Sequence, residues 1–215
     1  MTRRSHDDAY ATPGADRRRR MQSLGAVTLS GGRYEICRPD GQPVPFESYD
    51  AMPDERWIWE LVEGRVLVAP PPSARKQLAA AHLHWELAVM APASACVVTR
   101  PSRVRIAGAG SVLVPDVAVI RCEQLGHRYV DPLLVADIRS PPEAVDEAEL
   151  RRRLFAQAGV PSYWLVATTG EPSLTALVLG ADGCYVEAAT ATGAQTLEVS
   201  RPFPVRIVPA SLLAG

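Results

Sequence analysis

The sequence predicts an α/β fold built on a central β-sheet. Three short apolar runs between Val112 and Val166 carry this prediction, because each has the length of a strand and is bounded by proline, glycine or charged residues. A charged helical segment separates the second run from the third. The runs are apolar throughout rather than alternating, which is typical of strands covered on both faces. They therefore mark the centre of the sheet.

Two carboxylates interrupt these apolar runs, Asp116 in the first and Asp137 in the second. A buried, ionised carboxylate is costly unless it is paired or coordinated. One divalent cation shared by both residues would offset the cost on two neighbouring strands. Helix capping and salt bridges to Arg139 or Arg151 are the alternative interpretation.

Composition sets mild bounds on the fold and on the function. A chain of 215 residues is long enough for one large domain, or one domain and a tail. No apolar run approaches the roughly 20 residues of a membrane span, and the N-terminus lacks the pattern of a signal peptide. The four cysteines are scattered without a CxxC pair, so we expect neither a zinc site nor a disulfide framework, and a reducing cytoplasm is the expected location.

The N-terminal segment differs in composition from the rest of the chain. Its first twenty residues hold six arginines and three aspartates with almost no apolar side chains. We therefore expect residues 1–24 to form a disordered basic tail and residues 25–215 to form one domain. The run Arg17-Arg18-Arg19-Arg20 could contact nucleic-acid phosphates, or it could be a solubilising extension.

The sequence of the first part of the domain predicts two hairpins and a short helix. Two weakly patterned strands flank the Ser30-Gly31-Gly32 turn, and a short helix from Phe46 stops at Pro53. Two further strands meet at Glu63-Gly64, and three prolines end the second of them. We expect Trp57 and Trp59 to pack rather than to stack on bases.

A helix follows the prolines, with Ser73 as its N-cap. Its apolar positions near one face are Leu78, Leu83, Leu87 and Met90. His82 and His84 are two residues apart and so point in different directions, which favours structural or surface roles over a shared metal. Residues 95–108 and 111–120 then predict an antiparallel hairpin.

The second half of the chain contains the strongest helical pattern. The strand that holds Asp137 closes at Ser140-Pro141-Pro142. Residues 143–159 carry acidic residues in the first turns, arginines in the middle and Gly159 at the end. The apolar side of this helix is Val145, Leu150, Leu154, Phe155 and Ala158. A strand with Tyr163 and Trp164 in the core, a hairpin turning at Ala181-Asp182-Gly183, a strand near residue 206 and a short helix from Pro209 follow.

Five segments, in this order, resemble the Uma-type putative restriction endonuclease family of the PD-(D/E)XK nuclease superfamily. They are ELVEGRVLVAPPPS, VPDVAVI, PLLVADIRSPP, AQAGVPSYWLV and RPFPVRIVP. The resemblance runs from about Tyr49 to the C-terminus. It implies a restriction-endonuclease-like core, which is a mixed central β-sheet flanked by helices, and the predicted C-terminal β-hairpin would be an addition to that core. It also implies cleavage of DNA phosphodiester bonds with Mg²⁺, or Mn²⁺ in its place, and a homodimer would suit double-strand cleavage.

The resemblance assigns the family's site positions to individual residues of this chain. Glu60 matches the glutamate that opens the family's E-L-(I/V)-(D/E)-G segment, and Asp116 matches the aspartate of its Pro-Asp pair. Asp137 stands where glutamate is usual, and Arg151 stands where a lysine has moved onto the helix. The secondary candidates are Glu147 in place of a helix aspartate, Arg139 at the older superfamily position of the lysine, and Lys76 where relatives often have histidine.

The chemistry explains these residue types. Mg²⁺ takes hard oxygen ligands, which Asp116, Asp137 and the Ile138 carbonyl could supply. The bound cation would activate a water and stabilise charge on the phosphate. Asp137 is one methylene shorter than glutamate, and Arg151 cannot act as a base. A catalytically inactive nuclease fold that binds nucleic acid or protein is therefore the alternative function.

Overall fold

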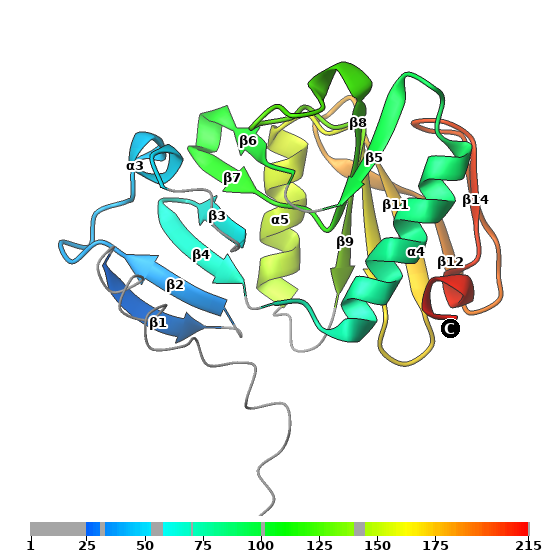
Figure 1. Ribbon diagram of the computed structural model, residues 1–215, viewed down its shortest axis with the longest axis horizontal. Coiled ribbons are helices and arrows are strands. Elements are labelled where there is room, and N and C mark those ends of the chain that lie inside the picture. Colours follow the sequence, from blue (N-terminus) through cyan, green and yellow to red (C-terminus); the bar gives the residue numbers. More distant parts are fainter. Residues whose placement is uncertain are drawn as a thin grey trace, which may run out of the picture.

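The structure is a computed structural model that describes residues 25–30, 33–52, 58–69, 71–99, 102–139 and 145–214. Its strands form two six-stranded sheets that lie side by side, and a small two-stranded sheet near the C-terminus (Figure 1). The predictions for the 1–24 tail, Trp57, the Gly31-Gly32 turn and the prolines after Asp137 fall outside the described residues. None of the described helices is long and apolar enough to cross a membrane.

The main sheet holds the apolar runs that predicted the fold. Its strands are β5 (Ala95–Thr99), β8 (Val117–Arg121), β9 (Leu134–Arg139), β10 (Ser162–Ala167), β11 (Ser173–Leu179) and β12 (Tyr185–Thr192). They are arranged in the order β12-β11-β10-β9-β8-β5. β9 and β10 are parallel, and the other neighbours are antiparallel. The predicted mixed sheet and the added hairpin, β11–β12, are both confirmed.

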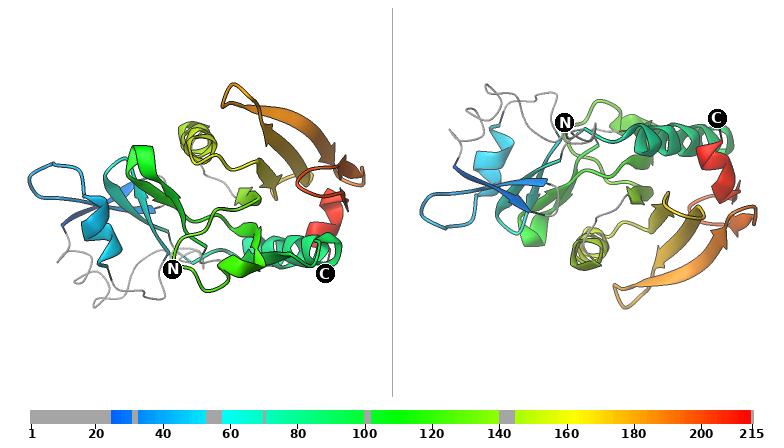
Figure 2. Two further views of the ribbon diagram at one scale, coloured as in Figure 1. Left: turned by 90° about the horizontal axis from the view of Figure 1, so that it is seen from above. Right: turned by 90° about the horizontal axis from the view of Figure 1, so that it is seen from below.

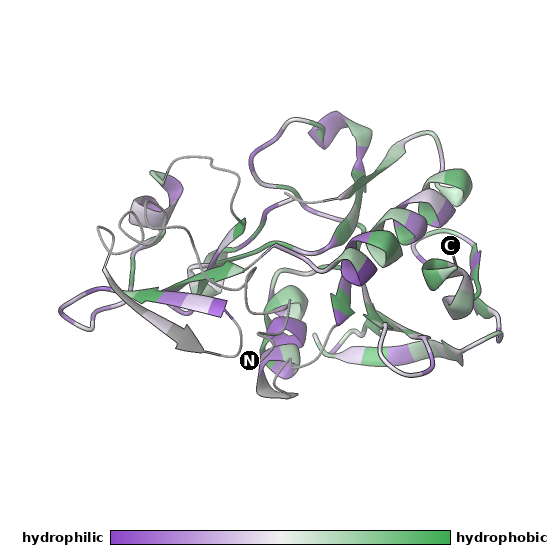
Figure 3. Cartoon of the chain, turned by 60° about the horizontal axis from the view of Figure 1, so that its bottom comes forward, coloured by the Kyte–Doolittle hydropathy of each residue, from purple (hydrophilic) through white to green (hydrophobic). Residues whose placement is uncertain are grey.

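Two helices cover opposite faces of this sheet (Figure 2). They are α4 (Ala74–Met90) and α5 (Val145–Gln157). α4 buries Ala79, Leu83 and Leu87 against the strands, while α5 buries Leu154 and Phe155 against the other side. Figure 3 shows hydrophobic residues concentrated in the strands and alternating with hydrophilic ones along the helices. Because helices cover both faces of the sheet, the sequences of the central strands are apolar without alternation.

The second sheet is built mainly from the N-terminal half of the chain. Its strands are β1 (Ala26–Ser30), β2 (Arg33–Cys37), β3 (Ile58–Val62), β4 (Arg65–Ala69), β6 (Val104–Ile106) and β7 (Ser111–Leu113). Their order is β1-β2-β4-β3-β7-β6, and α3 (Phe46–Asp50) packs beside them through Tyr49. The Tyr49 hydroxyl donates a hydrogen bond to the Trp59 carbonyl, 2.7 Å away.

One predicted hairpin is divided between the two sheets. Thr99 pairs with Val117 in the main sheet, whereas Val104 pairs with Leu113 in the second sheet. The antiparallel pairing was therefore predicted correctly, but as one hairpin rather than two pieces. Residues 114–116 cross between the sheets, and this crossing places Asp116 at the junction.

Two local predictions depend on single residues and are confirmed. The Ser73 side chain accepts a hydrogen bond from the Lys76 amide and caps α4. The β3–β4 turn has φ of 48° at Glu63 and 79° at Gly64. A side chain at Gly64 would also come within 2.9 Å of the Pro43 Cα, so this turn needs glycine for space as well as for conformation.

Other details differ from the sequence predictions. Leu78 is 37% exposed, because the core face of α4 is centred on Ala79, Leu83 and Leu87. His82 has its predicted structural role, with Nδ1 3.2 Å from the Leu212 carbonyl oxygen. The remaining elements are β13 (Leu197–Val199), which was not predicted, β14 (Val205–Ile207), and the short helices η1 (Ala107–Ala109), η2 (Cys122–Gln124) and η3 (Pro209–Leu213).

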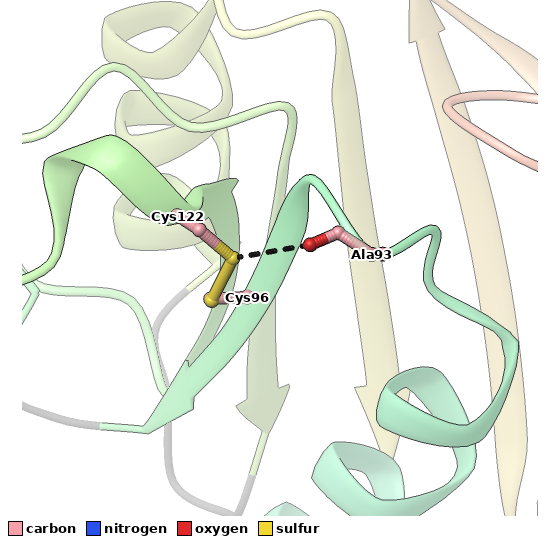
Figure 4. Close-up of a disulfide and its surroundings, with 3 residues drawn as sticks. All are labelled: Ala93, Cys96 and Cys122. Carbon is pink, nitrogen blue, oxygen red and sulfur yellow. Dashed lines mark hydrogen bonds between the residues drawn. A yellow bond between two sulfur atoms is a disulfide. The ribbon is translucent and has the colours of Figure 1, made fainter.

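A disulfide joins Cys96 and Cys122, contrary to the expectation from their spacing (Figure 4). The two residues are 26 positions apart in the sequence, but the antiparallel pairing of β5 with β8 brings their Cα atoms within 5.1 Å. That distance lies in the range a disulfide requires. Cys37 and Cys184 are free thiols.

We predict that Cys96→Ser will lower the free energy of unfolding by about 2–4 kcal/mol, since the crosslink restricts the unfolded chain. Urea melts with and without dithiothreitol would measure it. Reductant should lower the stability of the wild type to that of the variant and leave the variant unchanged. Cys184→Ser is the matched control. Four alkylatable thiols in the denatured protein, after purification in air without reductant, would contradict the prediction.

Candidate functional site

A small charged pocket lies where the two sheets meet. Its walls come from β2, β9, β10, α4, α5 and the residue before β8. The lining residues are Arg33, Lys76, Asp116, Asp137, Arg139, Ala148, Arg151, Tyr163 and Leu165. The open space at its centre is about 10 Å³, which is room for about one water molecule or one small ion.

Arg151 is the central contact of this pocket. Its Nε and Nη2 atoms donate to the two carboxylate oxygens of Asp137, at 2.7 and 3.0 Å. Its Nη1 donates to Oε1 of Glu60, 2.7 Å away. The guanidinium thus joins α5 to β9 of the main sheet and to β3 of the second sheet. Arg151 is 8% exposed, so these are buried ion pairs.

The buried pairs control the protonation of the site. Burial alone would raise the pKa of both carboxyls, but the positive charge of Arg151 outweighs it and holds the pKa of Glu60 and of Asp137 below their usual values. Burial would lower the pKa of Arg151, yet Asp137 and Glu60 raise it well above the ordinary value. Both carboxylates and the guanidinium are therefore charged at neutral pH.

Glu60 lies behind Arg151 rather than in the wall of the pocket. It is 3% exposed, and its Oε1 also accepts the Val114 amide at 2.7 Å. Arg33 donates to its other oxygen at 2.8 Å and forms a second ion pair with Glu147 at 2.7 Å. Glu147 therefore belongs to the same network, through a cation from β2.

Asp116 is held by the neighbouring strand and by α4. Its Oδ2 accepts the amide of Ile138 at 2.7 Å and lies 2.9 Å from the Lys76 ammonium. Lys76 is the only lysine of the chain. It also lies near enough to Asp137 to help lower the pKa of that residue. Lys76 thus brings an ammonium into the pocket from α4, whereas α5 carries Arg151 where the resemblance implies a lysine.

A model of the Uma2 family, described as a putative restriction endonuclease family, matches residues 46–211. The chain belongs to the Uma2 family. The solved structure of a putative nuclease belonging to DUF820, from Anabaena variabilis ATCC 29413, aligns with a TM-score of 0.64. That alignment covers 80% of this chain and 98% of the other at 14% identity, so it shows a shared fold. No curated protein sequence matches this chain.

In this Uma2 protein the structure brings together all the residues that the sequence singled out. Lys76, Asp116, Asp137, Arg139 and Arg151 line one pocket, and Glu60 and Glu147 join it through ion pairs. Two participants were missed. Arg33 comes from a weakly patterned strand and has no sequence signal. Tyr163 was assigned only to the core, yet its hydroxyl donates to Asp137 at 2.9 Å.

The donor set fits a divalent cation of the kind that nucleases with this fold generally use. Asp116 and Asp137 provide carboxylate oxygens around a space for one small ion. The Ile138 amide points at Asp116, so the Ile138 carbonyl lies on the same edge of β9. In the described part of the chain no three His, Cys, Asp or Glu side chains are arranged around a metal position. A metal here would therefore rely on two carboxylates, the main chain and water.

We predict that Arg151→Met will destabilise the protein by about 3–5 kcal/mol, because it leaves two buried carboxylates without their cation. Chemical denaturation at pH 7 would measure the change. Arg153→Ala is the matched control on the same helix. Its ion pair with Glu63 is more than half exposed on both sides, and about 1 kcal/mol or less should be lost there. Equal losses in both variants would contradict a special role for Arg151.

The pH dependence of stability should also distinguish the wild type from Arg151→Met. Because the pKa values of Glu60 and Asp137 are lower in the folded wild type than in the unfolded chain, these residues stabilise the wild type at pH values above their unfolded pKa, about 4. This stability is lost as the pH falls through the lower pKa values of the folded state. In Arg151→Met the buried carboxyls should take up protons more readily than the unfolded chain. The stability difference should therefore begin to narrow above about pH 4, where the carboxyls of the variant take up protons, and should narrow further below about pH 4, where those of the wild type do. A constant difference between pH 3 and 7 would count against this account.

Proposed function

We propose that this Uma2 protein is an endonuclease that cleaves DNA phosphodiester bonds with a divalent cation, Mg²⁺ or Mn²⁺, bound at Asp116 and Asp137. One observation carries the proposal. The single lysine of the chain reaches Asp116 in the pocket that also holds Asp137. An aspartate pair beside an ammonium is the set of groups that metal-assisted phosphodiester hydrolysis needs. A cytoplasmic location is part of the proposal, and there the Cys96–Cys122 pair would be kept reduced.

The proposal gives each side chain a distinct task. The cation would be held by Asp116, Asp137 and the Ile138 carbonyl, and it would lower the pKa of a bound water and stabilise charge on the phosphate. Lys76 is 14% exposed at its side chain and would place a compact ammonium beside the phosphate.

The remaining cations and acids support that centre. Arg151 is fixed by two carboxylates, so it keeps Asp137 in one orientation and supplies a constant positive charge. Glu60 holds Arg151 in turn, and Glu147 holds Arg33. Arg139 lines the same pocket and adds a further cation facing the phosphate. Double-strand cleavage would need two such centres, for which a homodimer is the simplest arrangement.

A second candidate function follows from the same contacts. Arg151 occupies both oxygens of Asp137, and the pocket holds Arg33, Lys76 and Arg139 as well. Cations that neutralise the carboxylates weaken attraction for a metal. A nuclease fold that binds nucleic acid or protein without cleaving it would have this charge balance.

Plasmid nicking in Mg²⁺ or Mn²⁺ separates these functions. We predict that the wild type nicks the plasmid and that Asp116→Ala does not, while Arg153→Ala, at an exposed ion pair, behaves as the wild type. Lys76→Ala should lose cleavage yet bind Mn²⁺ at least as tightly in calorimetry, because a positive charge next to Asp116 is removed. An inert wild type at high enzyme and metal concentrations would favour the second function. Cleavage that persists in Asp116→Ala would reject this site.

We further predict that restoring the family's usual residues at positions 151 and 137 will have coupled effects on cleavage. Arg151→Lys should preserve or raise cleavage, because an ammonium can also lose a proton, but it should lower stability because it cannot contact Asp137 through two parallel hydrogen bonds. Asp137→Glu should raise cleavage if the short side chain limits the reaction. The double variant should not equal the sum of the single ones, since the two side chains touch. Rates and melting temperatures of all four proteins test this, and additive effects would contradict it.

A further inference from the structure

A groove continues outward from the charged pocket along α4. It has a volume of about 240 Å³ and shares Lys76 and Asp116 with the pocket. Its other walls are mainly apolar or uncharged: Pro72, Gln77, Ala80, Ala81 and Thr99. The pocket itself has room for about one water, whereas the groove is many times larger. A phosphate with its attached sugar must therefore approach Lys76 and Asp116 from the groove.

The groove leads onto an exposed row of side chains on α4. Gln77, Ala81, Trp85 and Val89 follow each other at intervals of four residues, so they form one ridge on the helix surface. Trp85 and Val89 are each 68% exposed, although tryptophan is usually buried to a large degree. The ridge spans about 18 Å and carries no charge. Trp85 and Val89 lie one turn apart and together form an exposed apolar patch that continues the line of the groove along α4.

We propose that this ridge is a platform for an unpaired strand of nucleic acid, whose scissile phosphate lies at Lys76 and Asp116. The inference rests on the proposed nucleic-acid substrate and adds which form of it binds. A base flanking the phosphate would lie against Ala81 in the groove, and a further base would stack on the Trp85 indole. Base faces are available for such contacts in a single strand, because in a duplex they are stacked on each other.

The observations favour a nucleic acid over a second copy of the chain. The ridge is continuous with the charged pocket, where Lys76 offers a phosphate contact and the groove walls offer apolar surface for a sugar or base. A ridge about 18 Å long on a helix about 10 Å wide covers roughly 200 Å², which is well below the roughly 800 Å² per partner of a standard protein interface. An uncharged aromatic platform next to a cation is the combination that proteins binding single strands use.

The test measures binding without cleavage, so that it does not depend on turnover. Fluorescence anisotropy of a labelled thymidine oligonucleotide in EDTA compares the wild type with Trp85→Ala. Loss of one stacked base should weaken binding about 5- to 150-fold. Val186→Ala is the matched control, because Val186 is an apolar side chain of β12 that is 54% exposed. It should bind as the wild type does. A duplex of the same length should bind more weakly and should not respond to Trp85→Ala.

Salt dependence distinguishes the two contacts. Trp85→Ala should leave the slope of log affinity against log salt unchanged, because it removes no phosphate contact, whereas Lys76→Ala should reduce the slope by about 0.7. Circular dichroism should show both variants folded. Adding a single strand should also quench tryptophan fluorescence in the wild type more than in Trp85→Ala.

Each outcome decides the proposal. Unchanged single-strand affinity in Trp85→Ala, or an equal loss for duplex, would overturn it. A change of molecular mass in Trp85→Ala on sedimentation, with unchanged affinity, would overturn it in favour of an interface between copies. If plasmid nicking depends on Asp116 but Trp85→Ala binds single strands as the wild type does, the endonuclease proposal is supported and the platform proposal is rejected. If Trp85→Ala weakens single-strand binding but the wild type does not nick the plasmid, the platform proposal is supported and the endonuclease proposal is rejected.

Discussion

The buried guanidinium of Arg151 is the contact on which the arrangement of the site depends. It comes from α5 and holds Asp137 in the main sheet and Glu60 in the second sheet. Three charges have been removed from water, and this is tolerable because the geometry is close and each carboxylate has further donors. Arginine suits the position, since its planar fork can contact two carboxylates at once and stays protonated. Arg151 therefore fixes the shape of the pocket, while a hydrophobic cluster shared by both sheets and the ion pairs Arg153–Glu63 and Arg33–Glu147 join the same elements elsewhere.

The charged pocket combines a rigid inner part with a more accessible outer part. Asp137, Arg151 and Tyr163 are buried, and Arg151 and Tyr163 both donate hydrogen bonds to Asp137, which fixes their positions. Asp116 and Lys76 lie at the outlet, where the groove along α4 begins. Preorganised charges that stay in place during a reaction stabilise developing charge at little reorganisation cost. The outer ammonium sits on a flexible chain and can adjust to a ligand.

The sequence and the structure differ where contacts cross between distant segments. The 95–121 hairpin has a regular antiparallel pattern, but whether it stays in one sheet depends on which strands pair beside it. β3 pairs with β7, and β9 pairs with β8, so the hairpin divides. Cys96 and Cys122 approach for the same reason, because strand pairing rather than spacing brings them together. Trp85 is two residues from both Leu83 and Leu87 and so points away from them, but only the tertiary structure shows that it is left 68% exposed.

The sequence by itself determined the mixed sheet, its two covering helices, the caps and turns, and the residue types at the site. The sheet, helices, caps and turns follow from local period and from glycine and proline geometry, and Asp116 and Asp137 follow from the cost of burying them. The mixed pairing of the strands and the other site residues come from the family resemblance. Only the tertiary structure decided which cation meets which acid. Arg151 pairs with Glu60 and Asp137, Arg33 links Glu60 to Glu147, and the lone lysine reaches Asp116 from α4. These partners lie between 14 positions apart, for Arg151 and Asp137, and 114 positions apart, for Arg33 and Glu147. The packing of helices and sheets selects them, and no period in the linear sequence predicts such pairs.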